Sequence, residues 1–211
     1  MGKIILIGGP PRSGKTTLAQ KISEETGISW VSSDALDDIA KRYVPESDLE
    51  RLFPKTTLRI KSGGENDGMY VAFSIEEIVS AYIKQAETIH KAIESFILCA
   101  NVEDWNYVIE GYHVTPKLIA KLRSENIDTS SVMLISTKAE EVIERSIKSD
   151  TKQDWLRDNT KNQETFQKIA DMISLFSKKL KQEAEENGIK VIDTSENFET
   201  KFQEAFDYLI K

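Results

Sequence analysis

The residues with the clearest chemical signature form one short run near the start of the chain. The run reads Gly9-Pro10-Pro11-Arg12-Ser13-Gly14-Lys15-Thr16 and fits the pattern G-x-x-x-x-G-K-[ST]. The glycines at both ends of the run lack a Cβ atom, so the backbone can curl and point several N–H groups inward. Such N–H groups hold the oxygens of a phosphate. The sequence therefore predicts a phosphate-binding loop.

An apolar strand and an amphipathic helix flank this loop. Residues 3–7 are mostly apolar and β-branched, which is typical of a buried parallel strand. Leu18 and Ile22 lie four residues apart, as on one face of a helix, and Gly27 follows where such a helix would end. The start of this helix adds the positive end of its dipole to the loop. Strand, loop and helix thus occur in the order that phosphate binding needs.

Each residue from Gly9 to Thr16, and Thr17 after it, is a candidate to bind a nucleotide. Lys15 is expected to reach the β- and γ-phosphates and to act in catalysis, and the Thr16 hydroxyl is expected to ligate Mg²⁺. Arg12 can add a positive charge near the γ-phosphate. The simpler alternative is a glycine-rich turn that only joins a strand to a helix.

Two acids follow predicted strands at their carboxyl ends, where α/β sheets place ligands. Asp34 follows the strand predicted over 28–33, and its carboxylate can accept a proton from a substrate hydroxyl. Its alternative role is to cap the next helix. Glu110 and His113 lie at the end of the strand predicted over 107–113. Glu110 can orient a Mg²⁺-bound water or hold substrate hydroxyls, and the alternative is a carboxylate paired within the core. His113 can hydrogen-bond or neutralise a substrate phosphate.

Residues 35–104 form a long connection between the second and third predicted strands. We expect a helical insertion that covers the substrate. Arg59 is its candidate substrate-binding residue, together with Arg42 and Arg51, and the alternative for each is a solvated surface side chain. Ser74-Ile75-Glu76-Glu77 has the form of a capping box, which opens a long helix with one buried stripe.

The remaining candidates come from the second half of the chain. A polar segment at about 148–160 is expected to close over the phosphates as a lid. A guanidinium near a transferring phosphoryl group stabilises the transition state, so Arg145 and Arg157 are catalytic candidates, with a solvated helix end as the alternative. Thr194 follows the last predicted strand and is placed to contact the nucleotide base.

Composition narrows the function classes. The chain has 211 residues, of which 39% are hydrophobic and 30% charged, and this suits a single domain over 1–211. A net charge of −7 argues against non-specific nucleic-acid binding. The single cysteine, Cys99, excludes an internal disulfide and a Cys/His metal cluster. We expect no membrane span and no signal peptide, a cytoplasmic location, and a monomer or homodimer.

The order of these features resembles the nucleoside-monophosphate-kinase-like branch of the P-loop kinases, over nearly the whole chain. Within that branch, the stretch Val108-Ile109-Glu110-Gly111-Tyr112-His113-Val114-Thr115-Pro116 is most similar to the 2-phosphoglycerate kinase group. The resemblance implies a three-layer α/β fold with a five-stranded parallel sheet of order 2-3-1-4-5. It also implies ATP with Mg²⁺, a substrate between residues 35–73 and the tip of the third strand, and Asp34 as the acid that acts on the acceptor hydroxyl.

The leading hypothesis is a kinase that transfers the γ-phosphoryl group of ATP to a hydroxyl of a small metabolite, 2-phosphoglycerate-like or sugar-acid-like. A nucleotide or nucleoside kinase is the first alternative, although Tyr112-His113 follow Glu110 where nucleotide kinases carry a phosphate-binding Arg. A non-catalytic ATP-binding sensor is the second. A GTPase switch is disfavoured because the chain has no Asn-Lys-x-Asp to recognise guanine.

Overall fold

The computed structural model describes residues 2–138, 141, 143–144 and 155–211. Its strands form one parallel sheet in the order β2-β3-β1-β4-β5, which confirms the predicted α/β fold and strand order. The strands are β1 (Ile4–Gly8), β2 (Ser29–Ser32), β3 (Tyr107–Gly111), β4 (Ser130–Ile135) and β5 (Val191–Asp193). The central strand β1 pairs with β3 on one side and β4 on the other, so the loop after β1 lies in the middle of the sheet's carboxyl edge.

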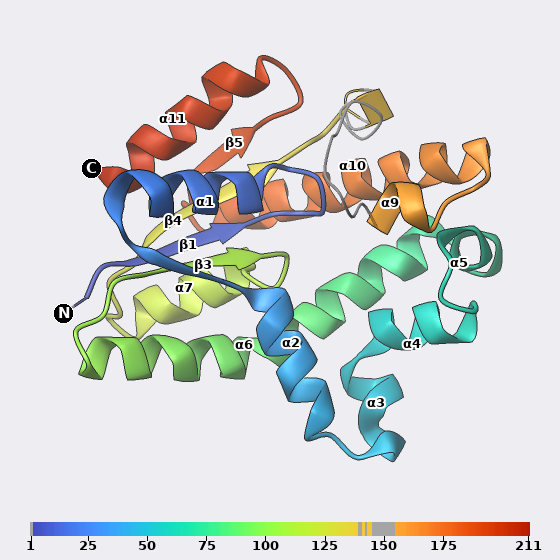
Figure 1. The fold of residues 1–211 in the computed structure, drawn as a ribbon, viewed down its shortest axis with the longest axis horizontal. Helices are drawn as coiled ribbons and strands as arrows, with labels where there is room; N and C mark the ends of the chain where they lie inside the picture. Colours follow the sequence, from blue (N-terminus) through green and yellow to red (C-terminus); the bar gives the residue numbers. More distant parts are fainter. Residues whose placement is uncertain (1, 139–140, 142, 145–154) are drawn as a thin grey trace.

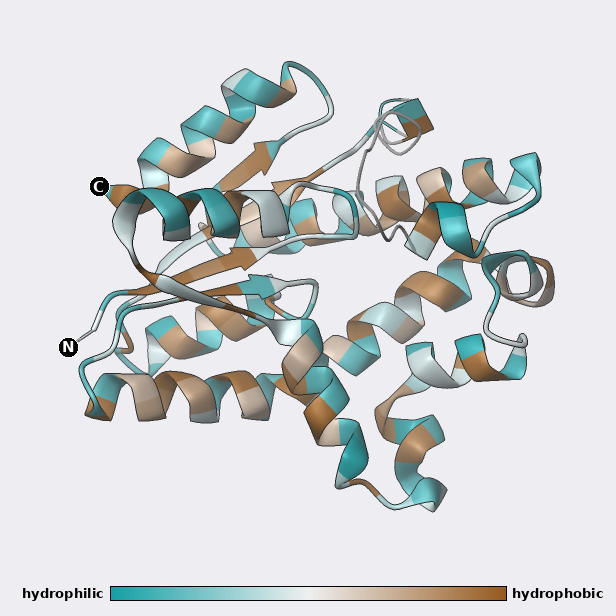
Figure 2. Ribbon diagram, in the orientation of Figure 1, coloured by the Kyte–Doolittle hydropathy of each residue, from teal (hydrophilic) through white to brown (hydrophobic). Residues whose placement is uncertain are grey.

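Helices cover both faces of the sheet, and alternate side chains of β1 explain why. Ile5 and Ile7 belong to the core under one helical layer, and Ile4 and Leu6 belong to the core under the other. The first layer consists of α1 (Lys15–Thr26) and α11 (Phe198–Ile210); the second consists of α6 (Ile75–Val102), α7 (Pro116–Ser124) and α10 (Gln163–Glu186). Figure 2 shows the apolar strands between these two layers. The chain thus forms three layers, helix on sheet on helix.

Four short helices fill the connection between β2 and α6. They are α2 (Ser33–Arg42), α3 (Glu46–Leu52), α4 (Pro54–Lys61) and α5 (Asn66–Ala72). Figure 1 shows them on the side of the molecule toward which the strand arrows point. The predicted capping box at the start of α6 is confirmed, because the Glu77 amide donates to Ser74 Oγ at 3.2 Å and the Ser74 amide donates to Glu77 Oε2 at 2.8 Å. Helices therefore border the carboxyl edge of the sheet.

The described part of the predicted lid packs on this helical region. The short helix α9 (Trp155–Asp158) lies beside α5, where Asn66 Nδ2 donates to Thr160 Oγ1 at 3.0 Å and to the Trp155 carbonyl at 3.3 Å. The rest of the predicted lid, before residue 155, lies outside the described residues. Among the helices that the structure describes, none is both long and apolar enough to cross a membrane.

Candidate active site

The phosphate-binding loop predicted from the sequence joins β1 to α1. Gly9 has φ +143° and Gly14 has φ +92°, and Arg12 between them also has a positive φ of 66°. A Cβ atom on Gly9 would lie 1.9 Å from the carbonyl oxygen of Leu134. The loop can therefore lie against β4 only because position 9 has no side chain. Left-handed backbone conformations of this kind are what a curled anion-binding loop requires.

Lys15 begins α1 and folds back over the loop. Its Nζ donates a hydrogen bond to the Pro10 carbonyl at 2.6 Å, and its side chain is buried. Burial lowers the pKa of Lys15, while the nearby carboxylates of Glu110 and Asp34 act in the opposite direction. The predicted nucleotide-binding lysine is therefore close enough to both predicted acids for their charges to act on it. The fold brings these three residues together from three separate elements.

Thr194 supports the loop from the end of β5. Its hydroxyl is buried and lies 3.2 Å from the Ser13 carbonyl and 3.0 Å from the Ile135 carbonyl. Ser13 Oγ in turn donates to the Pro10 carbonyl at 3.0 Å. The Thr194 side chain thus contacts the protein's own backbone, whereas the sequence predicts a contact with the nucleotide base. That base contact stays a prediction.

Glu110 ends β3 beside the phosphate-binding loop, since it is in register with Ile7 of β1 and Ser32 of β2. Its side chain is 3% exposed. Burial raises the pKa of Glu110, and Lys15 together with hydrogen bonds from the Ser32 and Thr16 hydroxyls partly offsets this effect. Glu110 is therefore a buried acid paired with residues of the site itself. Thr16, the predicted Mg²⁺ ligand, lies next to it.

Asp34 lies in the first turn of α2 and faces solvent, with its side chain 70% exposed. The helix is capped by Ser32, whose side chain accepts from the Asp34 amide at 3.3 Å, so the alternative role of Asp34 as the cap is wrong. Its charge acts on Lys15 in the phosphate-binding loop and on Lys55 in α4. Asp34 is thus an accessible carboxylate whose charge reaches two cations.

His113 is fully buried behind Asp34. Its Nδ1 lies 2.8 Å from Ser33 Oγ and 3.7 Å from Asp34 Oδ1, and its Nε2 lies 3.5 Å from Asp37 Oδ1. The sequence predicts direct contact between His113 and a substrate phosphate, but this burial gives a substrate no access to the imidazole. What the geometry provides instead is a contact between His113 and the start of α2.

Gly111 makes this contact possible. It has φ +144°, and a Cβ atom there would lie 1.8 Å from Ser33 Oγ. Gly111→Ala is expected to destabilise the protein by about 3 kcal/mol, because both the backbone conformation and the contact with α2 oppose a side chain. Gly27→Ala is the matched control: its φ is +74°, but nothing lies within 4 Å of the added Cβ, so about 1 kcal/mol of backbone strain is expected. Urea unfolding measures both, and equal losses would contradict the close packing at Gly111.

Asp37 is a site residue that the sequence analysis missed. It is 4% exposed and accepts a hydrogen bond from Gln85 Nε2 at 2.9 Å, while Lys41 Nζ lies 2.9 Å from its other oxygen. Burial disfavours its charge, but His113 and Lys41 outweigh burial and lower the pKa of Asp37 from 3.8 to about 2. Its spacing three residues after Asp34, on the same face of one helix, is the signal that could have revealed it.

The lowered pKa of Asp37 predicts a pH-dependent contribution to stability. An acid whose pKa is lower in the folded state stabilises the protein above its unfolded pKa and stops doing so as the pH falls through the folded value. From pH 7 down to about 4, Asp37 is expected to contribute about 2 kcal/mol, declining toward pH 2. Urea unfolding of the native protein and Asp37→Asn at several pH values measures this difference. The exposed neighbour Asp38, which also pairs with Lys41, provides the control Asp38→Asn; equal pH dependence of the two variants would contradict the assignment.

Besides the cations of the phosphate-binding loop, a second cationic cluster lies on α4 and consists of Lys55 and Arg59. Lys55 Nζ is 5.4 Å from the ring centre of Tyr82 and 5.6 Å from that of Tyr112, and Arg59 follows one turn later on α4. Burial lowers the pKa of Lys55, and Asp34 and Asp37 counteract this effect. Arg59 was predicted as a substrate-binding candidate from the sequence, whereas Lys55 was not. Both are half-buried on the helix that faces the start of α6.

The other predicted cations are placed differently. Arg51 is exposed and pairs with Asp48 at 3.1 Å, and Arg42 is exposed, as solvated surface side chains would be. Arg157 lies on α9 with its residue exposed. Arg145 lies outside the described residues. The catalytic roles of Arg145 and Arg157 stay predictions.

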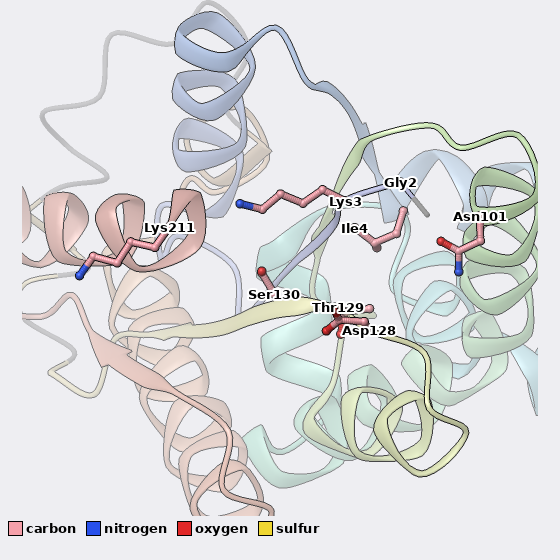
Figure 3. Close-up of a pocket in the computed structure, with 8 residues that line it drawn as sticks. All are labelled: Gly2, Lys3, Ile4, Asn101, Asp128, Thr129, Ser130 and Lys211. Carbon is pink, nitrogen blue, oxygen red and sulfur yellow. The ribbon is translucent and has the colours of Figure 1, made fainter.

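A separate cavity of about 360 Å³ lies at the opposite edge of the sheet. It is bordered by residues that precede or begin strands, such as Gly2 before β1 and Ser130 at the start of β4 (Figure 3). None of the predicted site residues lines it. Ligands of open α/β sheets bind at the carboxyl ends of the strands, so the phosphate-binding loop and its neighbours are the candidate site.

Solved structures share this fold over nearly the whole chain. A shikimate kinase from Bacteroides thetaiotaomicron matches at a TM-score of 0.54 and 14% identity, covering 99% of both chains. A sugar kinase from Janibacter sp. HTCC2649 matches at 0.52 and 16%, covering 100% of this chain and 95% of the other. A gluconokinase from Sinorhizobium meliloti 1021 matches at 0.50 and 13%, covering 99% and 91%. No family model and no curated protein matches the chain. At these identities the likeness concerns the fold alone.

Proposed function

We propose that the protein is an ATP-dependent kinase that transfers the γ-phosphoryl group to a hydroxyl of a small metabolite. The observation that carries this proposal is the position of Asp34. It is an exposed carboxylate whose charge acts on Lys15 in the phosphate-binding loop and on Lys55 in the second cationic cluster. A hydroxyl beside Asp34 would lie between a site for phosphates and a site for the rest of the acceptor.

The similarity in fold to solved structures supports the same class of enzyme. The similar proteins are described as a shikimate kinase, a gluconokinase and a sugar kinase. The resemblance of Val108–Pro116 to the 2-phosphoglycerate kinase group makes the proposal finer, with a 2-phosphoglycerate-like or sugar-acid-like acceptor. In this scheme one domain spans 1–211, residues 35–104 cover the acceptor, and about 148–160 form the lid.

The proposed reaction transfers one phosphoryl group and one proton. The acceptor oxygen forms a bond to the γ-phosphorus, the bond from that phosphorus to the β–γ bridging oxygen breaks, and the acceptor proton moves to the Asp34 carboxylate. Lys15 and Arg12 stabilise the negative charge on the phosphates. His113 holds the start of α2, and thereby Asp34, from behind. Arg145 and Arg157 are proposed to complete the site from the lid.

The donor set beside the loop fits Mg²⁺. Thr16 supplies a hydroxyl oxygen next to the Glu110 carboxyl, and Mg²⁺ in phosphoryl transfer is usually held by one or two such groups together with the nucleotide phosphates and water. Within the described ranges, no group of three or more His, Cys, Asp or Glu could hold a metal by itself. When bound with ATP, Mg²⁺ would neutralise charge on the β- and γ-oxygens.

The test is ADP release from Mg²⁺-ATP in the presence of acceptors from three classes: phosphoglycerates and sugar acids, neutral sugars and polyols, and nucleosides with their monophosphates. Stimulation by the first class is the expected result. Stimulation by nucleosides or nucleoside monophosphates alone would replace the proposed acceptor with a nucleotide. ATP binding without stimulation by any acceptor class would contradict a kinase that acts on these acceptors and would favour an ATP sensor.

A further inference from the structure

We infer that Lys55 and the Tyr112 hydroxyl form an oxyanion subsite that binds the carboxylate or phosphate group of the acceptor. The ring of Tyr82 borders this subsite. This inference rests on the proposed kinase function and extends it to residues that the sequence did not indicate. The subsite lies between α4, which provides Lys55, α6, which provides Tyr82, and the segment after β3, which provides Tyr112.

Lys55 is a cation without a matching anion in the described part of the chain. No carboxylate there lies within ion-pair distance of its Nζ, although Asp34 and Asp37 are close enough to influence its pKa. Asp37 is already engaged by Lys41 and Gln85. The described contacts of the ammonium group are the faces of two tyrosine rings. A half-buried cation of this kind is stabilised by a ligand that brings a negative charge.

The Tyr112 ring under Lys55 also carries a buried hydroxyl. Tyr112 is 6% exposed, and its oxygen has no hydrogen-bond partner among the described residues. Gln85 lies near it, but both N–H groups of its Nε2 are used: they donate to Asp37 Oδ1 at 2.9 Å and to Thr56 Oγ1 at 3.2 Å. A buried hydroxyl without a partner is costly unless a ligand supplies one.

Tyr82 and Tyr112 pack against each other under Lys55. Their rings lie edge to face with centres 4.9 Å apart, so the two faces under Lys55 hold each other in place. Arg59, on the same helix, is near enough to Lys55 and Tyr82 to affect the pKa of both. The subsite therefore combines the Lys55 ammonium with the Tyr112 hydroxyl, which suits a carboxylate or a phosphate monoester.

The position of Asp34 defines the acceptor class further. Asp34 Oδ1 lies 3.7 Å from His113 Nδ1, and the His113 and Tyr112 ring centres are 3.7 Å apart. Because Lys55 lies over the Tyr112 ring, an acceptor with its hydroxyl at Asp34 can place an oxyanion at Lys55. A hydroxy acid or a phosphorylated alcohol satisfies both ends of the site. A neutral polyol or nucleoside would leave Lys55 without a counter-charge, and desolvation would then reduce its affinity.

The experiment compares binding to the native protein with binding to Lys55→Met, which keeps the apolar stem over the rings and removes the charge. Lys61→Met on the same helix is the matched control, because Lys61 is exposed and pairs with Glu50 at 2.6 Å. The probes for calorimetry are gluconate, 2-phosphoglycerate, inorganic phosphate and the neutral polyol glucitol. We expect Lys55→Met to weaken the binding of the anionic probes by at least about tenfold and to change the affinity for ATP by less than about twofold. Tyr112→Phe should weaken the binding of the anionic probes by about threefold.

The arms of the experiment separate the two sources of the oxyanion. Tighter binding of gluconate than of either phosphate would assign a carboxylate, and the reverse order would assign a phosphate. The inference is overturned if the anions bind Lys55→Met as well as the native protein, if glucitol binds as tightly as gluconate, or if no anion binds below about 10 mM. If anion binding depends on Lys55 but no acceptor stimulates ADP release, the proposed kinase function is refuted and the subsite stands. If ADP release is stimulated by a neutral acceptor, the kinase function stands and the subsite is refuted.

Discussion

Lys15→Met is expected to lower acceptor-dependent ADP release by about a thousandfold or more. In the native protein the Lys15 ammonium lies against the loop, at hydrogen-bond distance from the Pro10 carbonyl and beside Glu110 and Asp34. It is the cation best placed to meet the β- and γ-phosphates, and methionine keeps its length but removes the charge. The measurement is kcat/KM for ADP release, together with a calorimetric titration of Mg²⁺-ATP.

A loss of folding is not expected to explain that result. Burial already disfavours the charge of Lys15, as its lowered pKa shows, so an apolar side chain of similar length suits the position. Lys21→Met, further along the same helix where Lys21 pairs with Gln203, is the control and should keep the native rate. A Lys15→Met protein that is folded and retains native turnover would rule out phosphoryl transfer at this loop.

The fold and the phosphate-binding loop could be predicted because their signals are local in the sequence. The loop is formed by consecutive residues, and the strands beside it are apolar runs that need both faces covered. The parallel order places the ends of β1 and β3 side by side, so Lys15 and Glu110 meet wherever this topology forms. Sequence reasoning is sufficient when the determinants of a structure lie within one element and its ends.

The acceptor side of the site depends on contacts between distant segments, which no local pattern reveals. Lys55 matters because α4 packs on α6 and brings it over Tyr82, and the sequence around it reads as an ordinary polar helix. His113 looked accessible at a strand tip, but Gly111 lets its segment approach Ser33 so closely that the imidazole is buried. The hydroxyl of Thr194 is likewise buried, against the carbonyl of Ser13. Burial is a tertiary property, which no local pattern in the sequence reveals.

Asp34→Asn is the second change with a large expected effect. The amide cannot accept the proton of the acceptor hydroxyl, so kcat should fall by about 10²–10⁴-fold. The affinity for Mg²⁺-ATP should change by less than about threefold, since Asp34 influences Lys15 but makes no contact with the loop backbone in the described hydrogen bonds. Because the side chain is 70% exposed and Ser32 caps the helix, stability should change by only about 0.5 kcal/mol.

Asp38→Asn separates this role from a general effect of charge on α2. Asp38 lies on the same helix, is exposed and pairs with Lys41 at 2.7 Å, so its loss removes an equal charge without touching the space between Lys15 and Lys55. Its turnover should therefore remain near the native value. If both variants slow to the same extent, the charge of the helix matters and proton transfer to Asp34 does not. If only Asp34→Asn slows while ATP still binds, the carboxylate between the two cations acts on the acceptor, because the phosphate-binding loop is unchanged in both proteins.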